Sequence, residues 1–578
     1  MIENRRLRDK WPYVVTILVV VATLMVIYRE ADITKPLVYQ NGDEMGVFYT
    51  IKSIKNGWYL SNPQVGGITG GDMYDYPYSD CMSFAIVKII SLFFSNIYLI
   101  GNVFYFLMYI LSAVTSIYVC RRLKYNNFTG LLVSVLYSFS PYIQLRYTHM
   151  WLLPYFMMPL ACMVAIWIID GEFNKVKVPW WRSKRHCQAI IISFACAFTG
   201  LYYAFFTCCI YMAAFVIYFI NSDIKIKKRD FYPLFCIFTV VFGVFVQIIP
   251  NLLYWIKNGI NGNSELSLRV IGDAERFGLK IIQLLLPRQG HRISRLSGLT
   301  EKYILNYPLV NENLTSAMGM IASIGLILSL IWLFGGKQKK TLSYLNISLI
   351  LIGTIGGIGS IFSLLIRTPM RAYNRISVMI MFISLLCVAG LLEKFQKKCT
   401  TKQFGLLVTI LLVVGIFDQT VDYKSSSIQV TNFESTQKFV ADIEGLMDEN
   451  DLIFQLPYVS WPTGGNYRMF SGYLNSENLR WSYGCMQGRE EALWQTQIAE
   501  SDLNTMLKSL AINGYKGLYL DVVVYASMKG EDELQSLINE VTTHLGEPPI
   551  ISANGELYYW NMAEYNKFIL PKVSNLGM

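Results

Sequence analysis

Charged residues are scarce in this sequence. Asp, Glu, Lys and Arg make up only 16% of its 578 residues, whereas hydrophobic residues make up 53%. Soluble domains contain about 25% charged residues, so a soluble protein of this length would have too few charges to cover its surface. The composition also excludes a disordered, collagenous, coiled-coil or small disulfide-framework protein. It indicates a polytopic membrane protein, and the mean hydropathy of +0.36 agrees with this.

The motifs of soluble enzymes are missing as well. The four histidines form no HExxH pair and show no other clear zinc spacing. The run Gly335-Gly336-Lys337 departs from the phosphate-binding Walker pattern, because that pattern requires glycine where Ile331 stands. Gln338 also follows the lysine, where the pattern requires Ser or Thr. We find no ATPase module, so any energy must come from a substrate or a gradient.

Long apolar segments dominate the first three quarters of the chain. A stretch of about 20 apolar residues is long enough to span a bilayer. The first such stretch, about 13–28, follows a basic N-terminus but no small-residue cleavage site, so we interpret it as an uncleaved span. The others fall near 97–119, 128–145, 150–169, 187–202, 203–220, 232–250, 314–335, 342–366, 372–392 and 404–418. The prediction is therefore about eleven transmembrane helices.

The distribution of charge predicts the orientation. With the N-terminus inside, every short inner loop is basic, as the positive-inside rule requires. Loops 29–96 and 251–313 and the tail 419–578 then lie outside. The tail holds 20 acidic and 10 basic side chains, so the rest of the chain carries +20. The overall charge of +10 is thus a topological signal, and it does not indicate a nucleic-acid partner.

Two outer cysteines leave one question open. Most of the 11 cysteines lie in or beside apolar spans, where a thiol behaves as a small hydrophobe. Cys81 and Cys485 are both outside in this topology. Their positions are compatible with a disulfide or with two free thiols, and the sequence does not decide between these.

The first outer loop contains the strongest candidates for chemistry. Asp43 and Glu44 precede apolar positions at helical spacing, with Lys52 on the opposite face, which predicts a short amphipathic helix lying flat on the membrane. The two carboxylates could deprotonate an acceptor hydroxyl or hold a divalent cation. Burial at the membrane edge would raise a carboxylate pKa toward the range useful for a base. The alternative is that Asp43 only caps the helix.

A glycine-rich and aromatic segment, 66–80, follows in the same loop. It contains two glycine pairs and the carboxylates Asp72, Asp75 and Asp80. Glycines, aromatics and carboxylates in a loop held at both ends suggest a binding surface. The alternative is that the three aspartates are solvated turn residues.

Basic residues on the outer face form a second set of candidates. Arg367, Arg371 and Arg375 surround the start of the span near 372–392, against the inside bias for bases. Arginine suits bidentate phosphate recognition. The alternatives are a snorkelling anchor or an ion pair with an outer carboxylate.

Two further pairs combine a histidine with an arginine on the outer face. They are Arg146 with His149, and His291 with Arg292. We include Arg146, His149 and His291 among the candidate substrate-binding residues. The alternative for each histidine is a satisfied interface residue.

The tail 419–578 has the pattern of a small α/β domain. Strands are predicted at 452–456, 518–524 and 557–561, and helices at 435–447, 502–511 and 531–544. We therefore divide the chain into a transmembrane domain, 1–418, and an extracytoplasmic soluble α/β domain, 419–578.

The layout resembles a known class of membrane proteins. An inner N-terminus, one span, a long acidic outer loop, many spans and an outer C-terminal domain resemble the GT-C superfamily of glycosyltransferases, and more closely the bacterial YfhO-like membrane proteins. The motifs run through most of the chain. They are Gly42-Asp43, Lys52-Ser53, Gly57-Trp58, Asp75-Tyr76-Pro77, Asp80, Pro141-Tyr142, Arg146, His149-Met150, Pro159-Leu160, Tyr202-Tyr203, His291-Arg292, Arg371, Asn374-Arg375 and Phe454-Gln455-Leu456-Pro457-Tyr458.

The resemblance implies a function. It implies transfer of a sugar from a polyprenyl-phosphate donor to a cell-surface polymer or glycolipid on the outer face of a bacterial plasma membrane. It also implies a catalytic base, which here matches Asp43, and basic residues holding the lipid phosphate, for which Arg371 and Arg375 are nearest. Metal use varies within the superfamily, so no cofactor is assigned. The alternatives are a transporter or flippase for a lipid-linked glycan, and a non-catalytic scaffold for envelope assembly.

Overall fold

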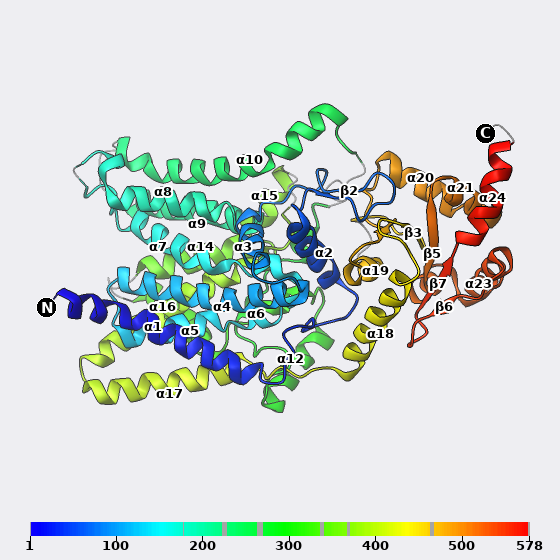
Figure 1. The fold of residues 1–578 in the computed structure, drawn as a ribbon. Coiled ribbons are helices and arrows are strands. Elements are labelled where there is room, and N and C mark those ends of the chain that lie inside the picture. The colour runs from blue at the N-terminus through cyan, green and yellow to red at the C-terminus, as the bar shows by residue number, and fades with distance from the viewer. Residues whose placement is uncertain are drawn as a thin grey trace.

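Helices form most of the molecule, and a small α/β part sits at one end of the helical bundle (Figure 1). The computed structural model describes residues 2–176, 178–221, 228–262, 270–335, 340–366, 370–462 and 467–575. Arg367 and the segment Gly336-Lys337-Gln338, both considered above, lie outside these residues. The N-terminus lies at the end of the bundle away from the α/β part.

The bundle and its connections contain most of the helices. They are α1 (Ile2–Ile27), α2 (Asp43–Asn56), α3 (Cys81–Ser91), α4 (Ile97–Arg122), α5 (Asn127–Ser138), α6 (Pro141–Gln144), η1 (Tyr147–Leu152), η2 (Tyr155–Met157), α7 (Met158–Ile169), η3 (Trp180–Arg182), α8 (Lys184–Cys196), α9 (Leu201–Asn221), η4 (Lys228–Phe231), α10 (Tyr232–Asn258), α11 (Asp273–Arg276), η6 (Ile281–Leu284), α12 (Ser294–Asn306), η7 (Glu312–Ser316), α13 (Met320–Phe334), α14 (Lys340–Gly353), α15 (Ile358–Ile366), η8 (Tyr373–Ile376), α16 (Ser377–Gln396) and α17 (Thr401–Gln419).

Among the described residues, seven stretches are long and apolar enough to cross a membrane: Lys10–Ile27, Ile97–Arg122, Tyr147–Ile169, Leu201–Ile220, Tyr232–Asn258, Tyr373–Gln396 and Thr401–Gln419. The polytopic helical class is confirmed, but the count of eleven is not. Several predicted spans are shorter or interrupted. The span near 128–145 divides into α5 and α6 at Ser140-Pro141, and the span near 342–366 divides into α14 and α15, where Gly356 adopts a φ of +70°.

The C-terminal part contains a five-stranded sheet flanked by helices. Its elements are α18 (Ser427–Glu444), β3 (Leu452–Leu456), η9 (Tyr467–Phe470), α19 (Ser471–Asn475), β4 (Arg480–Trp481), α20 (Glu490–Ala499), α21 (Leu503–Ile512), β5 (Tyr515–Asp521), α22 (Val522–Lys529), α23 (Glu531–Leu545), β6 (Ile550–Ile551), β7 (Leu557–Asn561) and α24 (Ala563–Asn575). The strand order is β4-β3-β5-β7-β6, with β4, β3 and β5 parallel and the other pairs antiparallel.

The α/β character of the tail is confirmed, with one strand shifted. The predicted strands 452–456 and 557–561 are observed with those bounds, whereas the predicted strand 518–524 is β5, Tyr515–Asp521. It ends early because the Asp521 carboxylate accepts a hydrogen bond from the Val524 N–H at 3.0 Å and so caps α22. We propose the boundary between the two parts at the end of α17, as in the sequence-based division.

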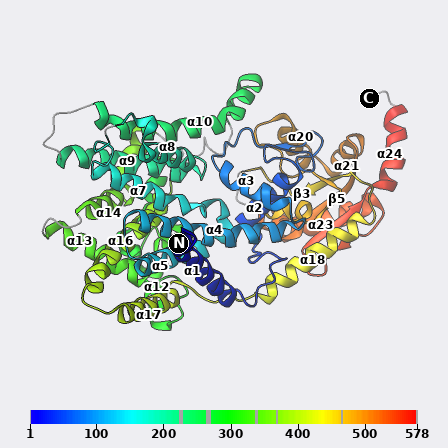
Figure 2. The ribbon, with the colours of Figure 1, turned by 60° about the vertical axis from the view of Figure 1, so that its left-hand side comes forward.

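The first outer loop lies between the bundle and the α/β part, and both views show α2 and α3 there (Figures 1 and 2). A small hairpin of β1 (Ser61–Asn62) and β2 (Gly71–Asp72) follows α2. The segment 64–67 is a turn that pairs with the edge of β4 through backbone hydrogen bonds. The Trp481 N–H donates to the Gln64 carbonyl, the Gly67 N–H to the Trp481 carbonyl and the Gly66 N–H to the Tyr483 carbonyl, each at 2.9 Å.

The glycine-rich segment therefore binds this protein's own C-terminal domain. Helix α2 is buried along most of its length, so the prediction that it lies flat on the membrane is wrong. Its Lys52, which was placed on a polar face, is only 1% exposed. All eleven cysteines, including Cys81 and Cys485, are free thiols in the structure, which favours the second of the two alternatives for that pair.

Candidate functional site

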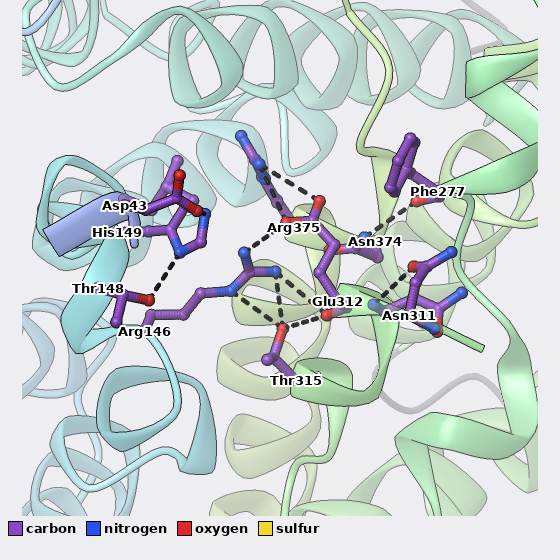
Figure 3. A network of polar contacts seen from close by, with 12 residues as sticks. Asp43, Arg146, Thr148, His149, Phe277, Asn311, Glu312, Thr315, Asn374 and Arg375 are labelled. Carbon is purple, nitrogen blue, oxygen red and sulfur yellow. Dashed lines mark hydrogen bonds and ion pairs between the residues drawn. The ribbon is translucent and has the colours of Figure 1, made fainter. Parts of the chain in front are cut away.

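Asp43 begins helix α2 at the end of the bundle that carries the C-terminal domain. Gly42 is the N-cap residue and has no side chain, and no side-chain capping bond is formed. The capping interpretation of Asp43 is therefore wrong. Its carboxylate Oδ2 instead lies 2.9 Å from Nε2 of His149, and the two side chains are 46% and 36% exposed. Figure 3 shows the pair facing each other beside a network of arginines.

The electrostatic environment of Asp43 differs from the sequence-based expectation. The hydrogen bond from His149 lowers the pKa of the Asp43 carboxyl. Partial burial and the negative charge of Glu312 oppose this, and Arg371 adds to the lowering. The expected rise in pKa is wrong. Asp43 is thus ionised at neutral pH, and it can accept a hydrogen bond or a proton from a bound hydroxyl.

His149 is held by its own short element. It lies in η1, where its φ of −122° and ψ of 54° interrupt the helical geometry. Its Nδ1 lies 3.1 Å from the Thr148 hydroxyl, so both ring nitrogens have partners within the site. A ring held at both nitrogens has a fixed orientation, and it fixes the orientation of the Asp43 carboxylate in turn.

Arg146 lies three residues before His149 but is only 1% exposed. Its Nη1 donates to Glu312 Oε2 at 2.6 Å, and its Nη2 donates to the Thr315 hydroxyl at 2.9 Å. The structure therefore places Arg146 in a closed internal network (Figure 3). We interpret it as a support for the site, not as the substrate ligand that the sequence suggested.

Glu312 is the centre of that network, and sequence reasoning did not find it. Both of its carboxylate oxygens lie 3.3 Å from Nη2 of Arg375, and Oε2 also accepts from Arg146. Burial opposes its ionisation, but Arg375 and Arg146 outweigh burial and hold the pKa of the carboxyl well below its usual range. A single Glu in an outer loop carries no motif, so only its approach to the two arginines reveals its role.

Arg375 and Arg371 differ in what they bind. Arg375 is 8% exposed and pairs with Glu312, as the ion-pair alternative predicted. Its guanidinium carbon lies 4.2 Å from the centre of the Tyr202 ring, and its Nε has no hydrogen-bond partner. The Arg371 guanidinium lies over the Phe277 ring at 5.2 Å, and no carboxylate among the described residues is within ion-pair distance of it. Arg371 is therefore the cation of this site that is available to an anion.

An apolar cavity of about 900 Å³ opens next to these arginines. Its walls come from α9, α10, α14 and α15, and they are almost entirely apolar. Leu201 and Met370 line it, and they are the sequence neighbours of Tyr202 and Arg371. Tyr202 and Arg371 are joined, because the Arg371 N–H donates to the Tyr202 hydroxyl at 3.5 Å. Tyr202 and Arg371 therefore lie at the end of the cavity that Leu201 and Met370 line, which we call the cavity mouth.

Asp80 lies at the same mouth and is buried, so its interpretation as a solvated turn residue is wrong. Its Oδ1 is 2.9 Å from the position that a Cβ of Gly200 would take, just before α9 begins. Burial raises the pKa of Asp80 to about 7, while the Ser79 backbone and Arg375 act in the opposite direction. No side-chain donor in the described part of the chain contacts its carboxylate. It is thus a buried acid next to the cavity mouth.

Asp75 is buried at a different place and forms a structural junction. Arg489 of the C-terminal domain donates two hydrogen bonds to its carboxylate, from Nε at 2.7 Å and from Nη2 at 2.8 Å. Trp255 Nε1 donates to the same carboxylate at 2.9 Å from the end of α10, and Asn261 Nδ2 at 3.0 Å. The structure therefore corrects both interpretations of Asp75, as a solvated residue and as a substrate ligand. It joins the first outer loop, α10 and the C-terminal domain.

Glu44 and His291 also lie outside the open site. Glu44 is buried, and its Oε1 accepts hydrogen bonds from the backbone N–H groups of Gln40 and Gly42 at 2.6 and 3.1 Å. His291 is buried against α17, with Nε2 3.3 Å from Asp418. We interpret both as structural residues, in place of the catalytic and substrate-binding roles suggested from sequence.

Comparison with known proteins gives distant structural likenesses. No family model matches the chain, and no curated protein matches it. It is similar to the apo oligosaccharyltransferase of Archaeoglobus fulgidus, at 10% identity over 89% of this chain and 70% of that one, with a TM-score of 0.44. It is also similar to the mycobacterial arabinofuranosyltransferase AftD, at 12% identity over 89% of this chain and 35% of that one, with a TM-score of 0.42. The chain thus spans about a third of the length of AftD.

The residues of the site do not fit a resident metal ion. Among the described residues, no three His, Cys, Asp or Glu side chains gather closely enough to hold one. The Asp43 carboxylate is paired with His149 and lies in the field of Arg371, and Glu312 is held by two arginines. A divalent cation would meet positive charge on each of these approaches. We therefore derive no step through a metal.

Proposed function

We propose that this protein is a membrane glycosyltransferase. It moves a sugar from a polyprenyl-phosphate donor to a hydroxyl of a cell-surface polymer or glycolipid, on the outer face of a bacterial plasma membrane. One observation carries the proposal: an open carboxylate–histidine pair lies in the field of an unpaired arginine, and that arginine adjoins an apolar cavity. A base, an anion site and an apolar channel are the three features that a sugar on a lipid phosphate requires.

The reaction follows from these positions. Asp43, oriented by His149, takes the proton of the acceptor hydroxyl, and the hydroxyl oxygen of the acceptor attacks C1 of the donor sugar. The bond between C1 and the phosphate oxygen breaks, and the lipid phosphate leaves with the electron pair. Arg371, with the free Nε edge of Arg375, stabilises the charge that grows on the phosphate. The polyprenyl chain occupies the apolar cavity beside the mouth.

Glu312 and Arg146 support this arrangement without touching the substrate. Glu312 neutralises two buried arginines that would otherwise repel each other, and it holds Arg375 against the Tyr202 ring. Asp80 lies where the first sugar would sit, and its carboxyl can accept hydrogen bonds from sugar hydroxyls. Because the donor arrives on a lipid, no nucleotide-binding fold is needed.

The decisive variant is Asp43→Asn, which keeps the shape of the side chain and removes the base. The protein would be reconstituted in liposomes with a panel of polyprenyl-phosphate sugars, and sugar transfer to envelope polymers measured. We expect the rate to fall by about 100-fold or more. Asp32→Asn is the matched control, because Asp32 is an exposed aspartate of the same loop. An Asp43→Asn protein that inserts normally and retains full transfer would contradict the proposal.

A further inference from the structure

Helix α2 is held from two sides. On one side it packs against η1, which contains His149, and on the other against η9 and α19 of the C-terminal domain. Asp43 is the first residue of this helix, so the position of α2 sets the distance between Asp43 and His149. The C-terminal domain thus contacts, through one short helix, the element that carries the proposed base.

Lys52 is the most unusual residue of this contact. Its ammonium is buried and donates hydrogen bonds to the backbone carbonyls of Tyr473 and Ser476, at the end of α19. It also lies 4.3 Å from the centre of the Tyr473 ring. No carboxylate of the described chain is within ion-pair distance of it, and burial lowers the pKa of Lys52 to about 8. A buried lysine without a counter-charge lowers the stability of the fold, so the two surfaces that Lys52 connects indicate its role.

Two neighbouring contacts connect the same surfaces. Asn62 donates from Nδ2 to the Ser53 hydroxyl at 2.8 Å and to the Tyr473 hydroxyl at 2.7 Å. The Tyr49 ring stacks on Phe470, with ring centres 4.3 Å apart and an angle of 11° between the planes. Together with the backbone hydrogen bonds between segment 64–67 and β4, these contacts hold α2 in one position against the domain.

Folds of this type usually bind ligands outside the carboxyl ends of their parallel strands. In this domain, side chains that bind one another occupy that edge. Asp521 ends β5 at this edge and is fully buried. Arg468 forms ion pairs with Asp521 and with Glu556. These three charged side chains of the edge therefore neutralise one another. The domain therefore contributes contacts to α2, and we see no ligand site of its own at this edge.

We infer that the C-terminal domain is part of the catalytic apparatus, and that Lys52 is a positioning residue which holds α2 so that Asp43 faces His149. This inference rests on the proposed function of Asp43. Hydrogen bonds weaken steeply as their distance and angle change, and small displacements of a catalytic group lower the rate strongly. A domain that fixes α2 therefore acts on the chemical step through Asp43, whereas no residue of α2 lines the donor cavity.

The test uses the full chain in lipid nanodiscs and the variant Lys52→Met, which keeps the apolar stem and removes the ammonium. We expect kcat for transfer to fall about 10- to 100-fold, with little change in the KM for the donor. We also expect faster hydrogen exchange of the backbone amides of α2. Lys516→Met is the matched control, because Lys516 pairs with Asp451 inside the C-terminal domain, at 3.2 Å, and does not contact α2.

A milder variant, Tyr473→Phe, keeps the ring beneath Lys52 and removes only the hydroxyl that Asn62 contacts. It keeps the inference testable if Lys52→Met does not fold, and we expect the same changes to a smaller extent. Unchanged exchange and kcat in both variants would overturn the inference. Faster exchange of α2 with unchanged kcat would overturn it too, because the position of α2 would then not matter for transfer. Failure of the proposed function is distinguishable, because Asp43→Asn would then be active while Lys52→Met still loosened α2.

Discussion

At the scale of single residues, the site depends on which charged groups stay accessible to a ligand. Arg146 and Glu312 bind each other, and Asp75 binds Arg489, so these charges are neutralised inside the protein. Arg371 and Asp43 remain accessible to a ligand. Residue type alone does not separate the two groups, because both contain Asp and Arg in the same outer segments.

Asp80 allows a test at this scale that does not require activity. Burial raises the pKa of Asp80 to about 7 in the folded protein, above the usual value of 3.8. A raised pKa means that its contribution to stability is fully present below pH 4 and is lost as the pH rises through 7. We therefore expect Asp80→Asn to unfold at a higher temperature than the wild type at pH 8, and the gap to shrink towards pH 4.5.

The measurement is the unfolding temperature of both purified proteins at the two pH values. Asp502→Asn serves as the control, because Asp502 is an exposed N-cap of α21 and Asn caps helices equally well. A gap of equal size at both pH values would contradict the assignment of a raised pKa.

At the scale of elements, the two glycine pairs of the first outer loop allow a close backbone approach. Gly66 has a φ of +77°, and a Cβ there would lie 2.7 Å from the Gly71 backbone nitrogen. The two pairs thus pack directly on each other, which brings segment 64–67 to the edge of β4. The glycines are required by this docking, and a side chain at Gly66 would separate the two backbones.

The corresponding variant is Gly66→Ala. Two penalties apply, the positive φ and the clash with backbone atoms that cannot rotate away, so we expect a loss of about 2 kcal/mol or more. Gly514→Ala carries the first penalty alone, because Gly514 has a φ of +81° but nothing within 4 Å of its Cβ position. Thermal unfolding and hydrogen exchange of β4 report the difference. Equal losses in the two variants would show that the close approach contributes nothing.

At the scale of the whole molecule, the helix α2 that carries Asp43 lies at the end of the bundle next to the C-terminal domain, and the N-terminus lies at the other end (Figure 1). The domain is anchored there by contacts to α2, to segment 64–67 and, through Arg489, to the end of α10. Because α10 also forms a wall of the apolar cavity, the domain, the base and the cavity form one connected unit.

The predicted orientation can be tested on intact cells. Cys399 is exposed in the connection between α16 and α17, and Lys508 is exposed on α21 of the C-terminal domain. A membrane-impermeant maleimide should label Lys508→Cys in intact cells and Cys399 only after permeabilisation, with the labelled peptides identified by mass spectrometry. Labelling in the reverse order would place the site on the inner face and would exclude an outer acceptor.

The sequence by itself determined what depends on local pattern. Apolar length gave the membrane class, and short runs rich in apolar and aromatic residues located β3 and β7 with their observed bounds. The charge of the loops predicts an orientation. Asp43 was also found in this way, because a carboxylate just before a helical pattern is a local feature. These properties need no partner from elsewhere in the chain.

The tertiary structure alone decided which charges are buried and which are open. Lys52 meets Tyr473, Arg146 meets Glu312, and Asp75 meets Arg489, each across more than a hundred residues of sequence. The helical period of α2 was correct, but its surroundings were not, since a hydrophobic pattern does not tell a bilayer from a neighbouring domain. Burial and pairing are properties of three-dimensional contact, so Glu312, Lys52 and the cavity mouth became visible only when the chain was folded.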